Sequence, residues 1–194
     1  MYIAFEGVDT VGKSTQINRI AERFADVLVT REPGGTPLGR KIRSILLDEG
    51  DALPRSELLL FLADRAEHTE RVIRPNLNRL ILSDRSFISG IAYAHVYDNI
   101  EIDTLLQLNR FATKNTFPEL IVLFRIEEDE LHRRMEQKKE DAIETRGIGY
   151  MLEVQKTMIE LVDLLKIRHI IVDAAEPIEI LTEKIYSYIK DCYR

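Results

Sequence analysis

The segment YIAFEGVDTVGKST (2–15) constrains the fold more than any other part of the chain. It matches G-x-x-x-x-G-K-[ST], directly after a short apolar run and before Ile17, Ile20 and Phe24 at helical spacing. In this strand–loop–helix context, backbone N–H groups and the start of the helix hold nucleotide phosphates, although a glycine-containing turn can also match by accident. We therefore predict a phosphate-binding loop made of Gly7, Val8, Asp9, Thr10, Val11, Gly12, Lys13, Ser14 and Thr15.

Two side chains of this loop have expected roles, and a third raises a question. Lys13 is expected to reach the β- and γ-phosphates, and the Ser14 hydroxyl to bind Mg²⁺. Asp9 is unexpected, because a carboxylate near phosphates is repelled. Its plausible partners are a sugar hydroxyl of a second substrate, or Mg²⁺ and its water ligands, whose charge would reverse the repulsion.

Short continuous apolar runs alternate with amphipathic stretches along the rest of the chain. Continuous runs are typical of strands buried on both faces, and their alternation with helices predicts a parallel sheet covered by helices on both sides. Ligands then bind at the carboxyl ends of the strands, where REPGG (31–35) and DR (84–85) fall. We expect one α/β domain over residues 1–194, with strands at 2–6, 27–30, 80–83, 120–126 and 169–173.

Composition excludes several classes of partner. The net charge of −6 argues against nucleic acid or an anionic membrane surface as a partner. No apolar run approaches the length of a membrane span, and the single Cys192 fits a reducing compartment. We expect a cytoplasmic enzyme.

Two helical stripes are candidates for a second substrate site. Phe61 and Arg65 lie four residues apart, so that the ring can stack on a base and the arginine can bind its edge. A core phenylalanine beside a surface arginine is an equally good interpretation. If a helix starts directly after the third strand, Arg85, Ser89 and Tyr93 share one face.

The remaining polar features concern phosphates and metal. Arg85 would bind a phosphate, and Asp84 at the strand end would bind Mg²⁺, unless Asp84 only caps a helix beside a solvated Arg85. RRMEQKK (133–139) would cover the donor phosphates, or is simply a solvated helix face. The chain has no N-K-x-D segment to read guanine, so a compact small-molecule kinase fits better than a GTPase.

The segments FEGVDTVGKST, TREPGGT, LFLADRAEH, SDRSFISGIAY and a late VDA together resemble the thymidylate kinase family over nearly the whole chain. The resemblance implies a P-loop NTPase fold with a five-stranded parallel sheet and a mobile lid, at about residues 133–149. It also implies phosphoryl transfer from ATP–Mg²⁺ to dTMP, giving dTDP and ADP as a step in dTTP synthesis, by a cytoplasmic homodimer.

The resemblance also assigns roles to single residues. Phe61 resembles the aromatic that stacks on thymine, and Arg65 the arginine that reads its O4 edge. Arg85 resembles the arginine that links the acceptor and donor phosphates, and Tyr93 the aromatic beside the deoxyribose. Arg43 resembles an arginine that binds the acceptor phosphate, and Arg134 resembles a lid arginine that acts in catalysis. The loop at 173–177 resembles the segment that passes near adenine.

Three positions depart from the family pattern. Thr10 stands where some relatives carry a catalytic arginine, which transfers the basic role to the lid. Gly90 stands where some relatives use Asn or Thr to contact the base, so Ser89, a backbone group or water must satisfy thymine N3. Arg125 stands where an acid often ends the fourth strand. Another P-loop kinase, or a nucleotide-dependent switch without transfer activity, remains an alternative.

Overall fold

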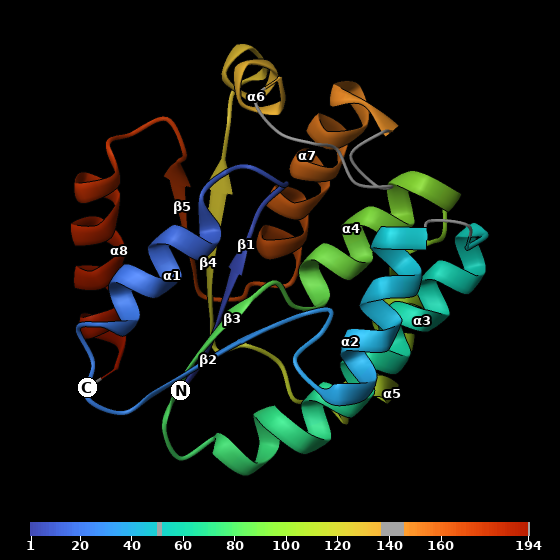
Figure 1. Ribbon diagram of the computed structural model, residues 1–194, viewed down its shortest axis with the longest axis horizontal. Coiled ribbons are helices and arrows are strands. Elements are labelled where there is room, and N and C mark those ends of the chain that lie inside the picture. The colour runs from blue at the N-terminus through green and yellow to red at the C-terminus, as the bar shows by residue number, and fades with distance from the viewer. Residues whose placement is uncertain (50–51, 137–145, 194) are drawn as a thin grey trace.

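The fold is built on one parallel sheet of five strands (Figure 1). The computed structural model describes residues 1–49, 52–136 and 146–193. The strand order is β2-β3-β1-β4-β5, and every neighbouring pair is parallel. The expected strand positions are confirmed to within one residue: β1 Tyr2–Glu6, β2 Val27–Arg31, β3 Leu80–Asp84, β4 Leu120–Arg125 and β5 His169–Asp173.

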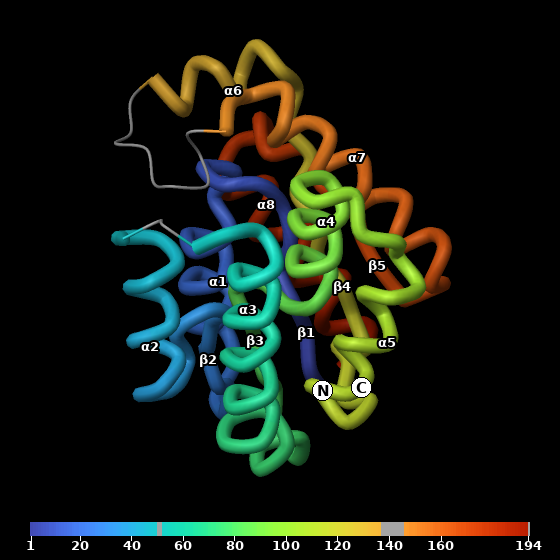
Figure 2. Tube along the Cα trace, turned by 90° about the vertical axis from the view of Figure 1, so that its right-hand side faces the viewer, coloured from blue at the N-terminus to red at the C-terminus, as the bar shows by residue number. Residues whose placement is uncertain are grey.

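Helices cover both faces of the sheet, and this explains the continuous apolar runs. All five residues of β1 are buried, as are the first five residues of β4. Helices α1 and α8 pack on one face, and α3, α4, α5 and α7 lie on the other (Figures 1 and 2). The helix bounds are α1 Lys13–Ala21, α2 Pro37–Arg43, α3 Pro54–His68, α4 Phe87–Asp98, α5 Ile102–Thr113, α6 Glu128–Met135, α7 Ile148–Leu164 and α8 Ile178–Cys192.

The register of the strands brings the predicted ligand-binding segments to one edge. Asp84 is the register partner of both Phe5 and Arg31, so β1, β2 and β3 end side by side. The loop after β1, the segment after β2 and the residues after β3 therefore meet at the carboxyl edge, as expected for an α/β sheet. None of the helices within the described ranges is long and apolar enough to cross a membrane.

Two expectations need correction or restriction. The helix after β3 begins at Phe87 and not directly after the strand, because Arg85 adopts a left-handed backbone with φ of 72°. A left-handed non-glycine residue cannot continue into an α-helix and carries a small energetic cost. The expected lid begins in α6, but its residues 137–145 lie outside the described residues.

Candidate active site

The loop between β1 and α1 is organised around Lys13. Gly12 has φ of 91°, which lets the chain turn sharply into α1. The Lys13 Nζ donates to the carbonyls of Gly7 at 3.1 Å and Val8 at 2.8 Å, so the ammonium group lies inside the loop. Burial, and then the nearby Arg85, lowers the pKa of Lys13 to about 8. This arrangement presents a cation and loop N–H groups to an anionic ligand.

Ser14 and Asp84 form an oxygen site at the start of α1. The Ser14 hydroxyl donates to the Asp84 carboxylate at 2.7 Å, although the residues are 70 positions apart in sequence. Mg²⁺ prefers oxygen ligands and keeps several waters or phosphate oxygens of its own, so this donor pair fits a nucleotide-bound Mg²⁺. Among the described residues, no cluster of three or more His, Cys, Asp or Glu could hold a metal by itself.

Arg85 connects the phosphate loop to α4. Its guanidinium donates to the Gly7 carbonyl at 2.9 Å, to the Ser89 hydroxyl at 2.9 Å and to the Asp9 carboxylate at 2.7 Å. Burial alone would lower the pKa of Arg85, but Asp9, Tyr93, Asp84 and Glu6 together outweigh it, so the pKa lies above its usual value. The Arg85 Cζ also lies 5.3 Å from the centre of the Tyr93 ring. Arg85, Ser89 and Tyr93 therefore meet as predicted, even though Arg85 precedes the helix.

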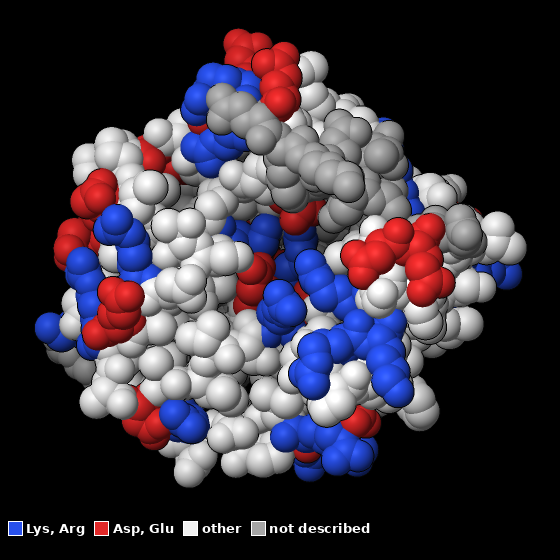
Figure 3. All heavy atoms as spheres, viewed as in Figure 1, with Lys and Arg blue, Asp and Glu red and all other residues white. Residues whose placement is uncertain are grey.

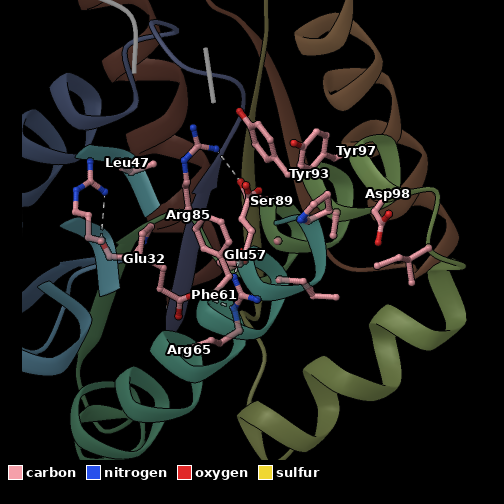
Figure 4. A pocket seen from close by; sticks show the side chains of 18 of the residues that line it. Glu32, Leu47, Glu57, Phe61, Arg65, Arg85, Ser89, Tyr93, Tyr97 and Asp98 are labelled. Atoms are coloured by element: carbon pink, nitrogen blue, oxygen red, sulfur yellow. Dashed lines mark hydrogen bonds and ion pairs between the residues drawn. The ribbon is translucent and has the colours of Figure 1, made fainter. Parts of the chain in front are cut away.

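Two adjoining pockets open at this edge of the sheet, in the charged hollow seen in Figure 3. The first encloses about 790 Å³, its open mouth included, and is lined by aromatic, aliphatic and polar side chains of α3 and α4 (Figure 4). The second lies over the phosphate loop. Both are lined by Asp9, Glu32, Arg43 and Arg85. A ligand in the first pocket can thus meet a phosphate in the second beside two arginines.

Phe61 and Arg65 both line the first pocket, from one face of α3. The alternative of a surface arginine is wrong, because Arg65 is only 4% exposed. Its Nε donates to Glu32 at 2.8 Å, its Nη1 to Asn109 at 2.8 Å and its Nη2 to the Ser86 carbonyl at 3.0 Å. The guanidinium is therefore fixed on three sides.

Sequence reasoning missed the acids beneath this pocket. Burial alone would raise the pKa of Glu32, but Arg65 and the buried His68 together lower it, so the carboxylate stays charged. Glu6 accepts hydrogen bonds from the Ser86 and Ser89 hydroxyls, and burial raises its pKa. Glu32 lies in REPGG, which the sequence placed at the ligand edge. Nothing in the sequence pattern marked Glu6.

Arg43 and Arg134 approach the site from opposite sides. Arg43 extends from the end of α2, with Nη1 3.3 Å from the Pro33 carbonyl, and lines both pockets. Arg134 donates to the Thr10 carbonyl at 3.2 Å and to the Ala174 carbonyl at 2.7 Å. It therefore joins α6 to the phosphate loop and to the loop after β5. Arg133 and Arg134 both pair with Glu130, but the Arg133 side chain lies on the exposed side of α6.

Four further side chains in or beside the first pocket were not predicted. Glu57 and Tyr97 line the pocket, and Arg146 contacts both: it pairs with Glu57 at 2.5 Å and its Cζ lies 3.5 Å from the centre of the Tyr97 ring. Arg146 also donates to the Tyr150 hydroxyl at 3.1 Å, and that hydroxyl donates to the Tyr93 carbonyl at 3.2 Å. These contacts tie the start of α7 to α3 and α4.

Arg125 and Gly90 also have defined surroundings. The Arg125 side chain is half exposed and lies 3.4 Å from Glu127, so a nearby acid balances its charge at the end of β4. Gly90 lies in α4 and lines the first pocket beside Arg65.

The family model described as thymidylate kinase matches residues 5–185. The thymidylate kinase of Campylobacter curvus is 50% identical over 193 residues, covering 98% of this chain and 100% of the relative. That of Sulfurimonas denitrificans is 48% identical over 189 residues, covering 97% and 99%. The crystal structure of thymidylate kinase from Ehrlichia chaffeensis superposes with a TM-score of 0.79 at 25% identity, covering 98% of each chain. Sequence, fold and site geometry agree, and the chain belongs to the thymidylate kinase family.

Proposed function

We propose that the chain transfers the γ-phosphoryl group of ATP to the 5′-phosphate of dTMP, giving dTDP and ADP. Its family membership as a nucleoside monophosphate kinase supports the reaction class. The single observation that carries the proposal is the junction of the two pockets: Arg43 and Arg85 line both the pocket over the phosphate loop and the pocket of Phe61 and Arg65. A nucleoside monophosphate with its base in the first pocket and ATP with its triphosphate in the second would have their phosphates side by side between these arginines.

Positioning and charge neutralisation carry this reaction. The acceptor phosphate is already a nucleophile, so transfer needs alignment more than a strong general base. Lys13 would bind the donor β- and γ-phosphates, and Arg85 would hold the acceptor phosphate in line with them. Phe61 would stack on thymine, Arg65 would donate to its O4 and Tyr93 would lie beside the deoxyribose, with Ser89 and Gly90 completing this wall of the pocket.

Magnesium is the cofactor that we propose. Ser14 and Asp84 would hold it, and bound Mg²⁺ would neutralise charge on the donor phosphates. Asp9 was predicted on the acceptor and metal side. Its carboxylate now lies on Arg85, so we propose that it orients this arginine and accepts from the sugar hydroxyl when dTMP binds.

A single assay tests the reaction. ADP release is measured with ATP–Mg²⁺ and each of dTMP, dUMP, dCMP, AMP, GMP and thymidine. We expect strong release with dTMP. Acceptor-independent or absent release would favour a nucleotide-dependent switch, and release with thymidine alone would indicate a nucleoside kinase. Stronger ADP release with another monophosphate would show that this compound, and not dTMP, is the acceptor.

Variants separate the roles of the cations. Lys13→Ala and Arg85→Ala should each lower kcat/KM by the equivalent of about 3–4 kcal/mol, as typical electrostatic contributors to transition states do. Arg134→Ala should lower kcat, because Arg134 is the described lid arginine that contacts the phosphate loop. Arg133→Ala is its matched control, since Arg133 lies on the same helix and pairs only with Glu130 among the described contacts. Near-normal turnover of Arg85→Ala would refute the proposed phosphate link.

We also propose that the protein works in the cytoplasm as a homodimer, without nucleic acid or membrane as a partner. The single cysteine, the negative net charge and the family resemblance support this. Phe111 offers an apolar contact, since it is 86% exposed on α5, whereas Leu105 is core. Sedimentation equilibrium of the wild type and of Phe111→Asp tests the dimer, and a monomeric wild type would refute it.

A further inference from the structure

The chain at the end of β2 is held against α3 at every second residue. His68 Nε2 lies 2.7 Å from the Thr30 hydroxyl, and His68 Nδ1 lies 2.8 Å from the Glu32 carboxylate. Asp64, one turn earlier on α3, accepts a hydrogen bond from the Gly34 N–H at 3.0 Å. Two side chains of one helix therefore hold residues 30, 32 and 34 of this extended segment.

Asp64 lies beneath the binding site and not in it. It is 1% exposed, and within the described part of the chain it does not line either of the two adjoining pockets. Its carboxylate therefore cannot touch a ligand in these pockets. Any effect of Asp64 on a substrate must pass through the groups that it contacts.

The same carboxylate also lies against α2. A Cβ added to Gly39 would overlap Asp64 Oδ1, which is the atom that accepts from Gly34. Gly39 lies inside α2 without a positive φ, so alanine could adopt its backbone conformation and would favour the helix. The close approach of Asp64 is the reason for a glycine that the structure provides. One buried oxygen thus contacts both the loop after β2 and the first turn of α2.

Arg43, at the end of α2, folds back onto this loop. Its Nη1 donates to the Pro33 carbonyl at 3.3 Å. A Cβ added to Gly34 would be 3.1 Å from Arg43 Cδ, and Gly34 has φ of 109°, a conformation that favours glycine. Gly34 therefore lies between the Asp64 carboxylate and the stem of Arg43.

We propose that Asp64 is a positioning residue for the acceptor phosphate: it fixes Gly34 and the first turn of α2, and these set where the Arg43 guanidinium lies at the junction of the two pockets. Without an acceptor at position 64, the Gly34 N–H would be left buried and unpaired, so the loop would shift to find another partner. The inference rests on the proposed function, because it requires an acceptor phosphate beside Arg43.

The test compares the binding of dTMP with that of thymidine, which has the same base and sugar but no phosphate. Dissociation constants are measured by calorimetry without ATP. Asp64→Ala should raise Kd for dTMP about tenfold and change Kd for thymidine less than about twofold. Asp64→Asn is the matched control: it keeps an acceptor oxygen for the Gly34 N–H, so both Kd values should stay within about threefold of wild type.

A double-mutant cycle tests the route through Arg43. Arg43→Ala removes the group through which Asp64 is proposed to act, so a further Asp64→Ala change should alter Kd for dTMP less than about twofold. Hydrogen exchange of the Gly34 amide is a readout that needs no ligand. The amide should be protected in wild type and in Asp64→Asn, and should exchange faster in Asp64→Ala.

Three results would overturn the inference. Equal weakening of dTMP and thymidine binding in Asp64→Ala would place its effect in the base pocket and not at the phosphate. Unchanged dTMP binding would leave Asp64 with a purely structural function. A full effect of Asp64→Ala in the Arg43→Ala background would show that Arg43 is not the route.

Two arrangements keep the test decisive. If Asp64→Ala does not fold, Gly39→Ala replaces it, because its Cβ would displace Asp64 Oδ1 while the carboxylate remains, and the same comparison of dTMP with thymidine applies. A wild type that binds dTMP but releases no ADP would refute the proposed transfer, whereas the Kd comparison would still decide whether Asp64 supports phosphate binding.

Discussion

Loss of the Arg146–Glu57 pair should measurably weaken both the fold and the acceptor pocket. The pair is bidentate, with nitrogen–oxygen distances of 2.5 and 3.3 Å, and the two side chains are 15% and 11% exposed. Removing one partner costs about 3–5 kcal/mol for a fully buried pair and about 0–1 kcal/mol at the surface. This pair lies between these limits, so we expect Arg146→Ala to lower the free energy of unfolding by about 2 kcal/mol, including its contact with Tyr97.

Urea unfolding of Arg146→Ala, Glu57→Gln and the double variant measures the coupling. We expect about 1–2 kcal/mol, because the contact is short and largely excluded from water. Arg23–Glu183 is a matched control: it is also an ion pair, at 2.6 Å, with an arginine over a tyrosine ring, but its side chains are 34% and 64% exposed. Its coupling should stay below about 1 kcal/mol.

The same variants report on the pocket. Glu57 and Tyr97 line it, so release of Arg146 should raise KM for dTMP more than KM for ATP. If the changes in the free energy of unfolding of the two single variants sum to that of the double variant within about 0.5 kcal/mol, Arg146 does not couple to Glu57. If KM for dTMP is also unchanged, Arg146 does not support the pocket.

Three further changes test single side chains. Phe61→Ala should raise KM for dTMP with little change in kcat, because stacking is present in the ground and transition states alike; a fall in kcat alone would contradict the stacking role. Because the pKa of Lys13 is about 8, ATP binding at pH 9 should take up close to one proton, measured by calorimetry in two buffers, and Lys13→Arg should abolish this uptake. Burial, and then Glu32, raises the pKa of Asp64 from 3.8 to about 6, so its charge destabilises the fold increasingly as pH rises from 3.8 to 6 and fully above. Asp64→Asn should therefore raise Tm at pH 7.5 but not below about pH 4. The corresponding increase in the free energy of unfolding is at most about 3 kcal/mol.

The sheet and the phosphate loop were predictable because their signals are local. A continuous apolar run such as β1 reports burial on both faces, and the spacing from Gly7 to Ser14 specifies the loop that follows. The shared face of Phe61 and Arg65 followed from the helical period alone.

The partners of these residues were not predictable, because they are distant in sequence. Glu32 and Asn109 bind Arg65 but lie 33 and 44 positions away in the sequence. The residue pattern of α3 therefore gives no indication of them. The prediction of where α4 begins was wrong for another reason. The left-handed backbone of Arg85 depends on contacts with the loop after β1, and sequence periodicity carries no information about such contacts.

Asp9 illustrates how the site is organised before phosphates arrive. A carboxylate in a phosphate loop is unfavourable if only the ligand is considered, but the Arg85 side chain is only 16% exposed and lies near Lys13. Asp9 is its strongest carboxylate counter-charge, ahead of Asp84 and Glu6. With Asp9 at 2.7 Å, the guanidinium is held in one orientation while it donates to Gly7 and Ser89. An incoming phosphate would meet an arginine whose direction is already set, so less ordering remains for the moment of binding. The acid at the third position of the loop is thus explained by the cation that it orients.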